Sequence, residues 1–299
     1  MNERRVIALG FFDGVHIGHG ALLQKTAERA KELGAAASAM SFDTHPDTLV
    51  FGRPAELLNT MDERRYLMQS LYGIEDVIFC HFDQAMMNMD WEAFAEDYLV
   101  NRLHACHLVC GHDYRFGARG LGDAQKLSAK CRALGLGCDI IEKVELDGVT
   151  VSSTHIRALL KQGKLEEATR FLGHAHIISG TVCHGDSRGH TLGLPTANLR
   201  LASSLLVPAF GVYGGWADAG EVGRYPTAVN IGVHPTVHQL SEPVAEASLL
   251  GFSGNLYGAF LRLELLFQVR PEQRFSSLDA LSAQIASDQQ TILHRLTNV

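Results

Sequence analysis

The sequence predicts two domains, an α/β domain with a parallel sheet followed by an all-β domain that ends in a helix. Short apolar runs alternate with helix-like stretches as far as about residue 175. Beyond that point the apolar runs are separated by Gly and Pro, and six of the eight prolines lie past residue 190. A length of 299 residues suits two domains of roughly 150 residues each. We place the domains at residues 1–174 and 175–299.

The first domain consists of repeated strand and helix segments. Strands are expected at 6–12, 35–42, 76–82, 106–111 and 138–144, and helices at 21–34, 61–73, 91–103 and 123–135. Strands that alternate with helices of about a dozen residues indicate βαβ units and a parallel, Rossmann-like sheet. In such sheets, ligands bind beyond the carboxyl ends of the strands.

The second domain is expected to be an antiparallel barrel or sandwich. Residues 154–173 still predict helix, in two short pieces broken at Gly163. Five apolar runs then predict strands, at 175–183, 211–217, 227–233, 246–252 and 259–267. Short strands punctuated by turn residues are typical of these antiparallel folds. A final helix is expected at 277–296, with Ser276 or Ser277 as its N-cap.

The composition disfavours several classes of protein. A formal net charge of -7, from 26 basic and 33 acidic residues, is unlike the basic excess of proteins that bind nucleic-acid backbones. The apolar runs are shorter than the roughly 18 residues of a membrane span, and residues 1–14 lack the apolar core of a secretory signal. Six cysteines without a CxxC pair indicate free thiols in a reducing compartment. We therefore expect a cytoplasmic protein without nucleic-acid or membrane partners, whose oligomeric state the sequence leaves open.

A histidine pair follows the first expected strand, in the segment LGFFDGVHIGH at 9–19. At a helix start, His16 and His19 are one turn apart and can face one ligand. Free N–H groups and the helix dipole make that place an anion site, and Gly14 and Gly18 allow close approach of the backbone. Imidazoles there can donate to charge that develops on a phosphate as a bond breaks. Taken alone, the motif would favour a surface pair or a metal pair.

A second phosphate-binding signature is VSSTHIR at 151–157. Serine hydroxyls at a helix start, followed by arginine, supply phosphate donors, although alone the segment would be a simple N-cap. Together, HIGH and SSTHIR resemble the nucleotidylyltransferase superfamily, in which both motifs hold the triphosphate of ATP. With SFDTHP (41–46) and GHDYRFG (111–117), the resemblance narrows to the adenylyltransferase half of prokaryotic bifunctional FAD synthetases. It covers nearly all of residues 6–160.

The resemblance implies a role for each motif. ATP phosphates would be held in the transition state by His16 and His19, and the departing pyrophosphate by Ser152, Ser153 and Arg157. The nucleotide side would also include Gly10, Phe12, Gly14 and Gly18, and the FMN side Phe42, His45, Pro46 and Asp113. The phosphate of FMN is already ionised near neutral pH, so this site must supply alignment and charge stabilisation, with Mg²⁺ on the phosphates, rather than a general base.

The second domain contains a Gly-rich loop followed by Pro-Thr-Ala-Asn. Gly185 and Gly189 flank a polar loop suited to folding over phosphates. In an extended segment, Thr196 and Asn198 project to the same face, and their oxygens are acceptable Mg²⁺ ligands. The spacing of a Walker A loop is absent. Glu246 lies in an apolar run. Unless it is paired, such a carboxylate suits the removal of an alcohol proton, although a lone strand Glu is more often exposed or ion-paired.

In sequence and order, these motifs resemble the riboflavin kinase domain. The resemblance rests on HGDSRGHTLGLPTANL (184–199), GVYGG (211–215), NIGVHPT (230–236), Glu246, NLYG (255–258) and VRPEQRF (269–275). It covers residues 178–290 and implies a six-stranded antiparallel barrel with a C-terminal helix. Glu246 would be the base for the ribityl hydroxyl, and Thr196 and Asn198 the ligands of Mg²⁺–ATP. The implied activity is phosphorylation of riboflavin to FMN and adenylylation of FMN to FAD, each with ATP and Mg²⁺.

Several positions depart from the family pattern. Phe11 stands where Asn is frequent, Gly20 where Gln is, Thr44 where Pro is, and Ser248 where His or Tyr is. His190 is expected to bind phosphate, and it replaces a permanent cation by a titratable one, so kinase activity should depend on pH. One alternative enzyme is a nucleotidylyltransferase that uses another acceptor, but the kinase-like second half of the chain argues against it. A rival of another class is a flavin-binding sensor or regulator with one or both catalytic sites impaired.

One further cluster suggests a metal site. It comprises His104, Cys106, His107, Cys110 and His112. Ligands along one flat strand rarely close a tetrahedron, so buried structural thiols are the preferred interpretation.

Overall fold

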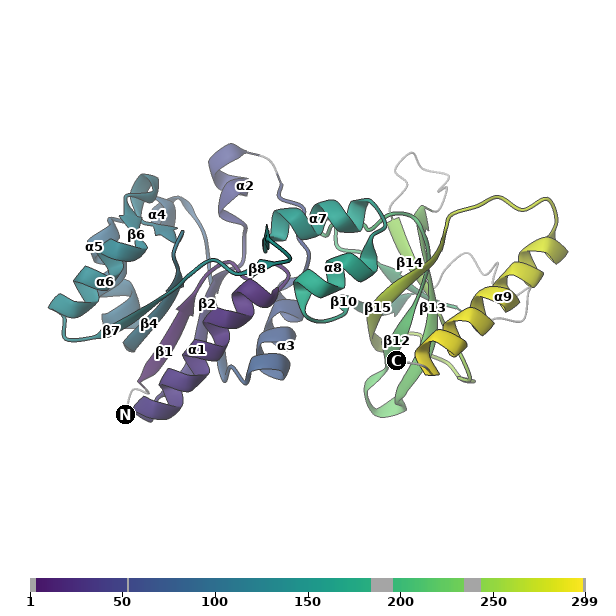
Figure 1. Cartoon of the computed structure of the whole chain (residues 1–299), viewed down its shortest axis with the longest axis horizontal. Coiled ribbons are helices and arrows are strands. Elements are labelled where there is room, and N and C mark those ends of the chain that lie inside the picture. The colour runs from purple at the N-terminus through teal and green to yellow at the C-terminus, as the bar shows by residue number, and fades with distance from the viewer. Residues whose placement is uncertain (1–3, 53, 184–195, 234–242, 298–299) are drawn as a thin grey trace. The chain divides into compact units, whose positions relative to one another are not determined.

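A computed structural model describes residues 4–52, 54–183, 196–233 and 243–297 (Figure 1). The chain divides into two compact units, Met1–Ser153 and Thr154–Val299. Helices α7 (Ser153–Lys161) and α8 (Leu165–Leu172) therefore fall almost wholly in the second unit, although the sequence predicts a boundary near residue 174. They join it by contact, because Ala209 donates its N–H to the carbonyl of Leu160 at 3.0 Å. The boundary between the functional domains stays a prediction.

The first unit is built on a five-stranded parallel sheet in the order β3-β2-β1-β4-β7. The strands are β1 (Arg5–Leu9), β2 (Ala36–Phe42), β3 (Asp76–Cys80), β4 (Ala105–Gly111) and β7 (Gly137–Ile141). Val6 to Leu9 of β1 are at most 1% exposed, as expected of a central strand covered on both faces. The predicted α/β fold with a parallel sheet is confirmed.

Helices cover both faces of this sheet (Figure 1). On one face α1 (Ile17–Leu33) packs against β1, β2 and β4, with α3 (Met61–Tyr72) beside it. On the other face a core of Ile7, Leu9 and Leu108 packs against α6 (Ala124–Ala133) and a π-helical segment, Phe94–Arg102. That segment continues α5 (Trp91–Ala93), so the helix expected at 91–103 is mostly π-helical. Shorter elements complete the unit: α2 (Pro46–Phe51), α4 (Gln84–Met87), β5 (Arg115–Phe116), a 3₁₀ turn (Ala118–Gly120), β6 (Gly122–Asp123), β8 (Glu145–Leu146) and β9 (Val149–Thr150).

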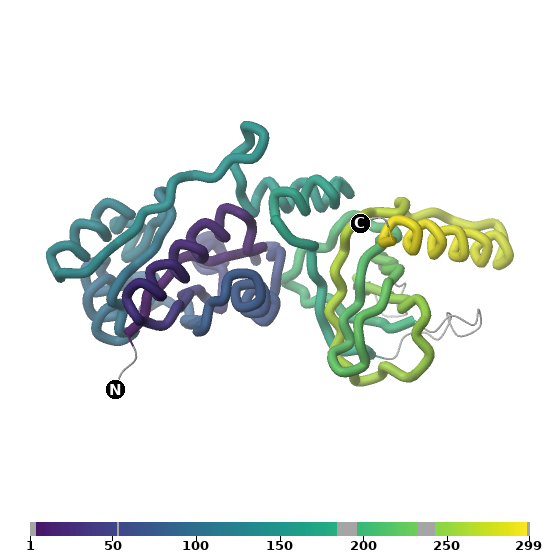
Figure 2. Tube along the Cα trace, turned by 60° about the horizontal axis from the view of Figure 1, so that its bottom comes forward, coloured from purple at the N-terminus to yellow at the C-terminus, as the bar shows by residue number. Residues whose placement is uncertain are grey.

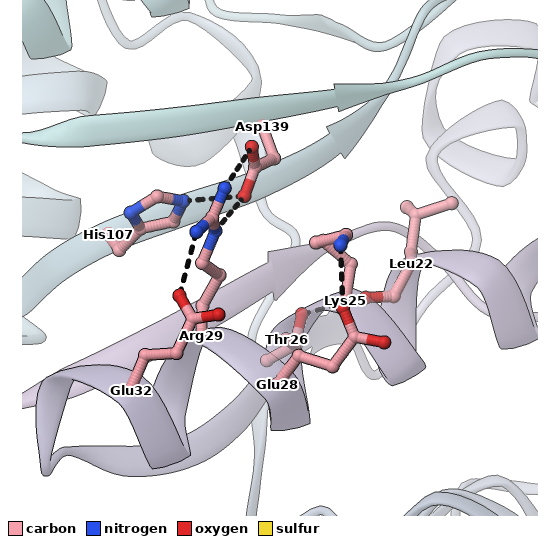
Figure 3. A network of polar contacts seen from close by, with 8 residues as sticks. All are labelled: Leu22, Lys25, Thr26, Glu28, Arg29, Glu32, His107 and Asp139. Carbon is pink, nitrogen blue, oxygen red and sulfur yellow. Dashed lines mark hydrogen bonds and ion pairs between the residues drawn. The ribbon is translucent and has the colours of Figure 1, made fainter.

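An ion-pair network ties α1 to β4 and β7 (Figure 3). Arg29 donates from Nε to Asp139 Oδ2 at 2.7 Å and from Nη1 to Glu32 at 2.7 Å. His107 Nε2 lies 2.9 Å from the same Asp139 oxygen. His107 is thus engaged with a carboxylate, while Cys110 lies in the core. Within the described ranges, no group of three or more His, Cys, Asp or Glu residues could hold a metal ion.

The second unit is a closed antiparallel barrel. The strands of its described part follow the order β10-β11-β14-β13-β12-β15, with bounds β10 (His176–Cys183), β11 (Ala197–Arg200), β12 (Gly211–Asp218), β13 (Arg224–Val233), β14 (Pro243–Leu249) and β15 (Phe260–Pro271), and a 3₁₀ turn at Gly220–Val222. In β14, alternate residues such as Ala245 and Ala247 are fully buried inside. The six-stranded barrel is confirmed, and the sandwich alternative is wrong.

The helices of this unit lie outside the barrel. A residue with positive φ, Gly163 at 75°, separates α7 from α8, as the sequence predicts. Helix α9 (Leu278–Thr297) runs along the barrel (Figure 2), where Ile292 is fully buried and Asp288 accepts from Arg270 at 2.9 Å. The Ser277 hydroxyl accepts from the N–H of Ala280 at 3.1 Å, so of the two expected N-caps it is Ser277 that caps α9.

Candidate functional site

Three of the predicted motifs follow neighbouring strands of the parallel sheet. The histidine segment follows β1, SFDTHP spans the end of β2, and GHDYRFG begins at the end of β4. Parallel strands end at one edge, and β1 lies between β2 and β4. The strand order reverses beside β1, and such a switch point is where ligands bind in open α/β sheets. The structure therefore brings these motifs to one edge of the sheet.

The turn after β1 is strained and firmly held. Phe12 has φ 59° and is fully buried, and Val15 has φ 40°; non-glycine residues with positive φ are uncommon and need support. Asp13 supplies part of that support, because its Oδ1 accepts from the N–H groups of Leu58 at 2.8 Å and Asn59 at 3.3 Å. The turn also uses Gly14, at φ 82°. The strand expected at 6–12 consequently ends at Leu9.

The two histidines occupy the first turn of α1. His16 is the N-cap, and its Nδ1 accepts from the N–H of His19 at 3.2 Å. Neutral His16 in this arrangement carries its proton on Nε2 and can donate from there. The two rings are stacked, with centroids 3.6 Å apart and an interplanar angle of 10°. The expectation that both face one ligand stays a prediction, but they lie side by side at the N-terminus of a 17-residue helix.

His19 is held neutral by its surroundings. Burial lowers the pKa of its imidazole well below the usual value, and the nearby His16 and Arg64 lower it further. Its Nδ1 is buried and has no hydrogen-bond partner within the described residues. The Phe12 ring packs edge-on against it, with centroids 5.2 Å apart. A neutral imidazole with an unsatisfied nitrogen beside a helix N-terminus is suited to donating to an anion.

The serine motif reaches the same turn. Ser153 donates its hydroxyl to the carbonyl of Asp13 at 2.9 Å, which places Ser152 and Ser153 beside the segment that carries the histidines. Gly18 lies close to both the His16 ring and Val151, so it has little room for a side chain. Arg157 belongs to the second compact unit, where its Nη2 donates to Thr154 Oγ1 at 3.2 Å.

The residues expected on the FMN side lie around the ends of β2 and β4. Phe42 is the last residue of β2, and its ring meets Phe82 edge-on with centroids 4.9 Å apart. His45 is the N-cap of α2, where its Nδ1 accepts from the N–H of Asp47 at 3.2 Å, and Pro46 opens that helix. Asp113 is exposed in the loop after β4. The contacts that the structure describes for these four residues are with other protein residues, so their place on the FMN side stays a prediction.

Sequence reasoning missed one buried charge at this edge. Arg64 of α3 is 0% exposed and donates to Phe11, Ser41 and Phe42. A signal was available, because Arg64, Leu67 and Met68 fall at the i, i+3 and i+4 positions of one helix face. A cation on an apolar helix face indicates a paired or functional residue.

The kinase motif forms a row across the barrel. In the register of β11 and β14, Asn198 pairs with Glu246, and Glu246 pairs on its other side with Asn230 of β13. Directly opposed residues of antiparallel strands project to the same face. Glu246 is half-buried, whereas Ala245 and Ala247 on either side point into the barrel and are fully buried. The carboxylate is therefore on the outer face, beside the nearly buried amide of Asn198, which is 7% exposed.

A cavity of about 290 Å³ lies beside β11 and β14, where Ala197 and Ala247, the sequence neighbours of Asn198 and Glu246, are part of its lining. Its lining contains Thr196 and Asn255 together with apolar and aromatic side chains such as Leu249, Phe252 and Tyr257. This size and composition, mainly apolar with a few polar groups, are typical of small-molecule sites. Thr196, which lines the cavity, lies two residues before Asn198 in the chain. Gly185, Gly189 and His190 lie outside the described residues.

The donor set suits the divalent cation expected here. Thr196 offers a hydroxyl and Asn198 an amide carbonyl, two residues apart on an extended segment, and the Glu246 carboxylate pairs with Asn198 in register. These are hard oxygen donors of the kind that Mg²⁺ accepts while it keeps water and phosphate ligands. Paired imidazoles at a helix N-terminus in one unit, and a carboxylate beside oxygen donors in the other, are features of enzymes that transfer phosphoryl or nucleotidyl groups.

Comparisons with known proteins agree with these features. The family model for FAD synthetase matches residues 1–155, and the model for riboflavin kinase matches residues 172–296. The bifunctional riboflavin kinase/FMN adenylyltransferase of Bacillus subtilis (strain 168) is 33% identical over 302 residues, which cover 99% of this chain and 94% of that protein. Its counterpart in Escherichia coli (strain K12) is 36% identical over 293 residues, with coverages of 97% and 92%. The chain belongs to the family of bifunctional riboflavin kinase/FMN adenylyltransferases, and it is an enzyme with both catalytic domains.

A solved structure shares the fold. The crystal structure of a Streptococcus pneumoniae protein described as a macrolide-efflux protein matches with a TM-score of 0.84 and 26% identity, over 98% of this chain and 94% of that one. In this chain, none of the helices in the described ranges is both long and apolar enough to cross a membrane. The alternative of a flavin sensor finds no support in the comparisons.

Proposed function

We propose that the barrel phosphorylates riboflavin to FMN with Glu246 as general base, and that the first unit adenylylates FMN at the His16–His19 pair. The observation that carries the proposal is the in-register pairing of Glu246 with Asn198. Only the kinase step needs a base, because an unactivated alcohol must lose its proton as it attacks phosphorus. The pairing supports the proposal because Asn198, opposite the Glu246 carboxylate, is one of the two oxygen donors proposed for the ATP-bound metal.

In the kinase step, Glu246 accepts the proton of the ribityl 5′-hydroxyl while that oxygen bonds to the γ-phosphorus of ATP and ADP leaves. Thr196 and Asn198 would hold Mg²⁺, which neutralises charge on the phosphates when it is bound. The neighbouring cavity, lined in part by Thr196 and by Phe252 and Tyr257, is large and apolar enough for a ring system of one substrate. Aromatic walls favour flat heterocycles.

In the adenylyl step, a phosphate oxygen of FMN bonds to the α-phosphorus of ATP, the α–β anhydride bond breaks, and pyrophosphate leaves. His16 donates from Nε2 and His19 from its protonated ring nitrogen to the developing charge. Ser152, Ser153 and Arg157 hold the pyrophosphate. Gly10, Phe12, Gly14 and Gly18 shape the turn, with Phe12 contributing only its backbone because its side chain is fully buried.

The substrates are small molecules: riboflavin, FMN and ATP. On the FMN side, Phe42, His45, Pro46 and Asp113 lie around the neighbouring strand ends. Six free cysteines support a reducing compartment, and we propose that the enzyme acts in the cytoplasm.

The proposal is tested by a pair of reciprocal variants assayed for both steps. Glu246→Gln should slow FMN formation from riboflavin by at least about 100-fold, the usual size of a general-base effect, and leave adenylylation of added FMN unchanged. His19→Asn should do the reverse, with a loss of about 10²–10³-fold, as for removal of one oxyanion donor. Glu221→Gln, at an exposed carboxylate of the same unit as Glu246, is the matched control and should leave both steps unchanged. Normal FMN formation by Glu246→Gln would remove Glu246 from the mechanism.

A further inference from the structure

The guanidinium of Arg64 is buried at the edge of the sheet that carries the histidine turn. Its Nη1 donates to the carbonyl of Phe11 at 2.7 Å and to the hydroxyl of Ser41 at 2.8 Å, and its Nη2 donates to the carbonyl of Phe42 at 3.1 Å. Ser41 also donates to the Phe11 carbonyl at 2.8 Å. One side chain from α3 therefore fastens the turn after β1 to the end of β2.

Ring contacts extend this connection to His45. The Arg64 guanidinium lies over the Phe11 ring, 4.3 Å from its centroid. The same ring meets the His45 ring edge-on, with centroids 4.4 Å apart. Phe11 thus has contacts with the helix that supplies Arg64 and with the N-cap of α2. Phe11 and His45 belong to two different motifs of the site, and the Phe11 ring contacts both the guanidinium and the His45 ring.

The arrangement is costly as a purely structural device. Arg64 is 0% exposed, and its three hydrogen-bond acceptors are two carbonyls and a hydroxyl, all of them neutral. Its Nε is buried without a partner among the described residues. Burial, partly offset by the charges of Asp13 and Asp43, lowers the pKa of Arg64 from 12.5 to about 10. Taking a cation out of water has a large cost in free energy, which contacts with neutral acceptors offset only in part, so stability alone does not account for it.

We propose that Arg64 is a positioning residue of the adenylyl-transfer step, which holds the nucleotide-side turn at Phe11 and the flavin-side segment at Phe42 in fixed register. The inference rests on the proposed function, because it assigns these two segments to the two substrates. In-line attack on phosphorus requires that the reacting atoms be held close to contact distance, and a displacement of about 1 Å can lower the rate about 100-fold. The same guanidinium also adds to the effects of burial and of His16 in lowering the pKa of His19.

The test compares three variants in the full chain. Arg64→Met removes the charge and all three hydrogen bonds of the guanidinium. Arg64→Lys keeps the charge, but an ammonium group lacks the planar, forked donors of a guanidinium and cannot bond all three acceptors. Arg65→Met is the matched control, because Arg65 is the next residue of α3, bonds the exposed Asp62 at 3.1 Å and likewise lies over an aromatic ring, that of Phe79. Riboflavin phosphorylation by the same chain is an internal measure of an intact second unit, and the Tm of each variant reports whether the first unit is folded.

We expect Arg64→Met to lower kcat for FAD formation about 100-fold, with a smaller change in KM. Arg64→Lys should lose about tenfold, since it makes fewer of the bonds. In Arg65→Met, kcat for FAD formation should stay within about twofold of the parent, as is usual for substitutions at the surface. Kinase activity should stay within about twofold of the parent in all three variants. The histidine ring signals should also change: in Arg64→Met the pKa of His19 rises, and in Arg64→Lys and Arg65→Met it stays near that of the parent, as followed by NMR titration.

The outcomes separate this inference from the proposed function. Folded Arg64→Met with parental kcat for FAD formation overturns the positioning role, as does a lower Tm with unchanged kcat and unchanged His19 titration. If Arg64→Met does not fold, Arg64→Lys carries the test: a kcat equal to that of Arg65→Met overturns the role. If His19→Asn retains full adenylylation, the proposed function itself is wrong. If FAD formation is lost in His19→Asn but not in Arg64→Met, only the positioning role of Arg64 is wrong.

Discussion

A buried histidine should make the barrel sensitive to mild acid. His176, the first residue of β10, is 2% exposed, and its Nε2 has no partner among the described residues. Burial, with a smaller contribution from the nearby His174, lowers the pKa of His176 from 6.5 to about 4. Because the folded-state pKa is below the unfolded one, the unfolded chain binds the proton first. Acid therefore favours unfolding between about pH 6.5 and pH 4.

The magnitude follows from the size of the shift. Each unit of pKa difference is worth about 1.4 kcal/mol. At pH 5 the proton on the unfolded chain lowers the free energy of unfolding by about 2 kcal/mol, and the full effect below pH 4 is about 3 kcal/mol. At pH 7.5 both states hold neutral His176, so the penalty is absent. His176→Leu removes the titrating group and an unsatisfied polar atom while keeping an apolar volume.

The assay is urea unfolding followed by tryptophan fluorescence. The chain has two tryptophans, of which Trp216 lies on β12 of the barrel, so the background variant Trp91→Phe leaves a single reporter. We expect His176→Leu to match the background at pH 7.5 within about 1 kcal/mol and to exceed it by about 2 kcal/mol more at pH 5. Parallel pH dependence in the two proteins would refute the reasoning that His176 is buried and neutral.

Two further predictions concern the first unit. Gly20→Ala should lower the free energy of unfolding by about 1–3 kcal/mol, as overpacking does, because a Cβ there collides with the hydroxyl end of Tyr72. Combining Gly20→Ala with Tyr72→Phe should restore part of the lost stability. A single variant as stable as the parent would show that the Tyr72 side chain moves aside without cost. Asp139→Asn should cost about 1 kcal/mol at pH 7, discounted for its partial exposure. Its hydrogen bond from Arg29 lowers the pKa of Asp139 below 3.8, so the deficit should begin to shrink as pH falls below about 4 and should vanish only below that lowered pKa. A deficit as large at pH 3 as at pH 7 would contradict the ion-pair account.

Local patterns predicted most elements of the fold. The alternating apolar and amphipathic runs locate the five strands of the parallel sheet, and Gly34 and Gly73 end α1 and α3 with left-handed caps. The strand expected at 6–12 was too long, because its apolar residues continue past Leu9 into a turn that buries Phe12 with a positive φ. The apolar composition of a segment indicates that its side chains are buried. It does not indicate the backbone angles, which here are set by the contacts that the turn makes in the folded protein.

Long-range partners explain what the sequence could not predict. Glu246 could be singled out as a carboxylate in an apolar run, but its place beside Asn198 depends on strand register. The guanidinium of Arg64 finds its acceptors 53 and 22 residues away along the chain, at Phe11 and Phe42. Such contacts exist only once the strands are in their order, and no spacing within α3 reveals them.

The central claim is that one chain carries both steps in order. It is tested most directly by chromatography of a reaction of the purified protein with riboflavin, ATP and Mg²⁺, sampled over time. The account predicts that FMN rises first and FAD follows as FMN is consumed. Flavin that stays bound and unchanged as riboflavin, with no consumption of ATP, would contradict the account, and FMN that accumulates without any FAD would contradict its adenylyl-transfer half.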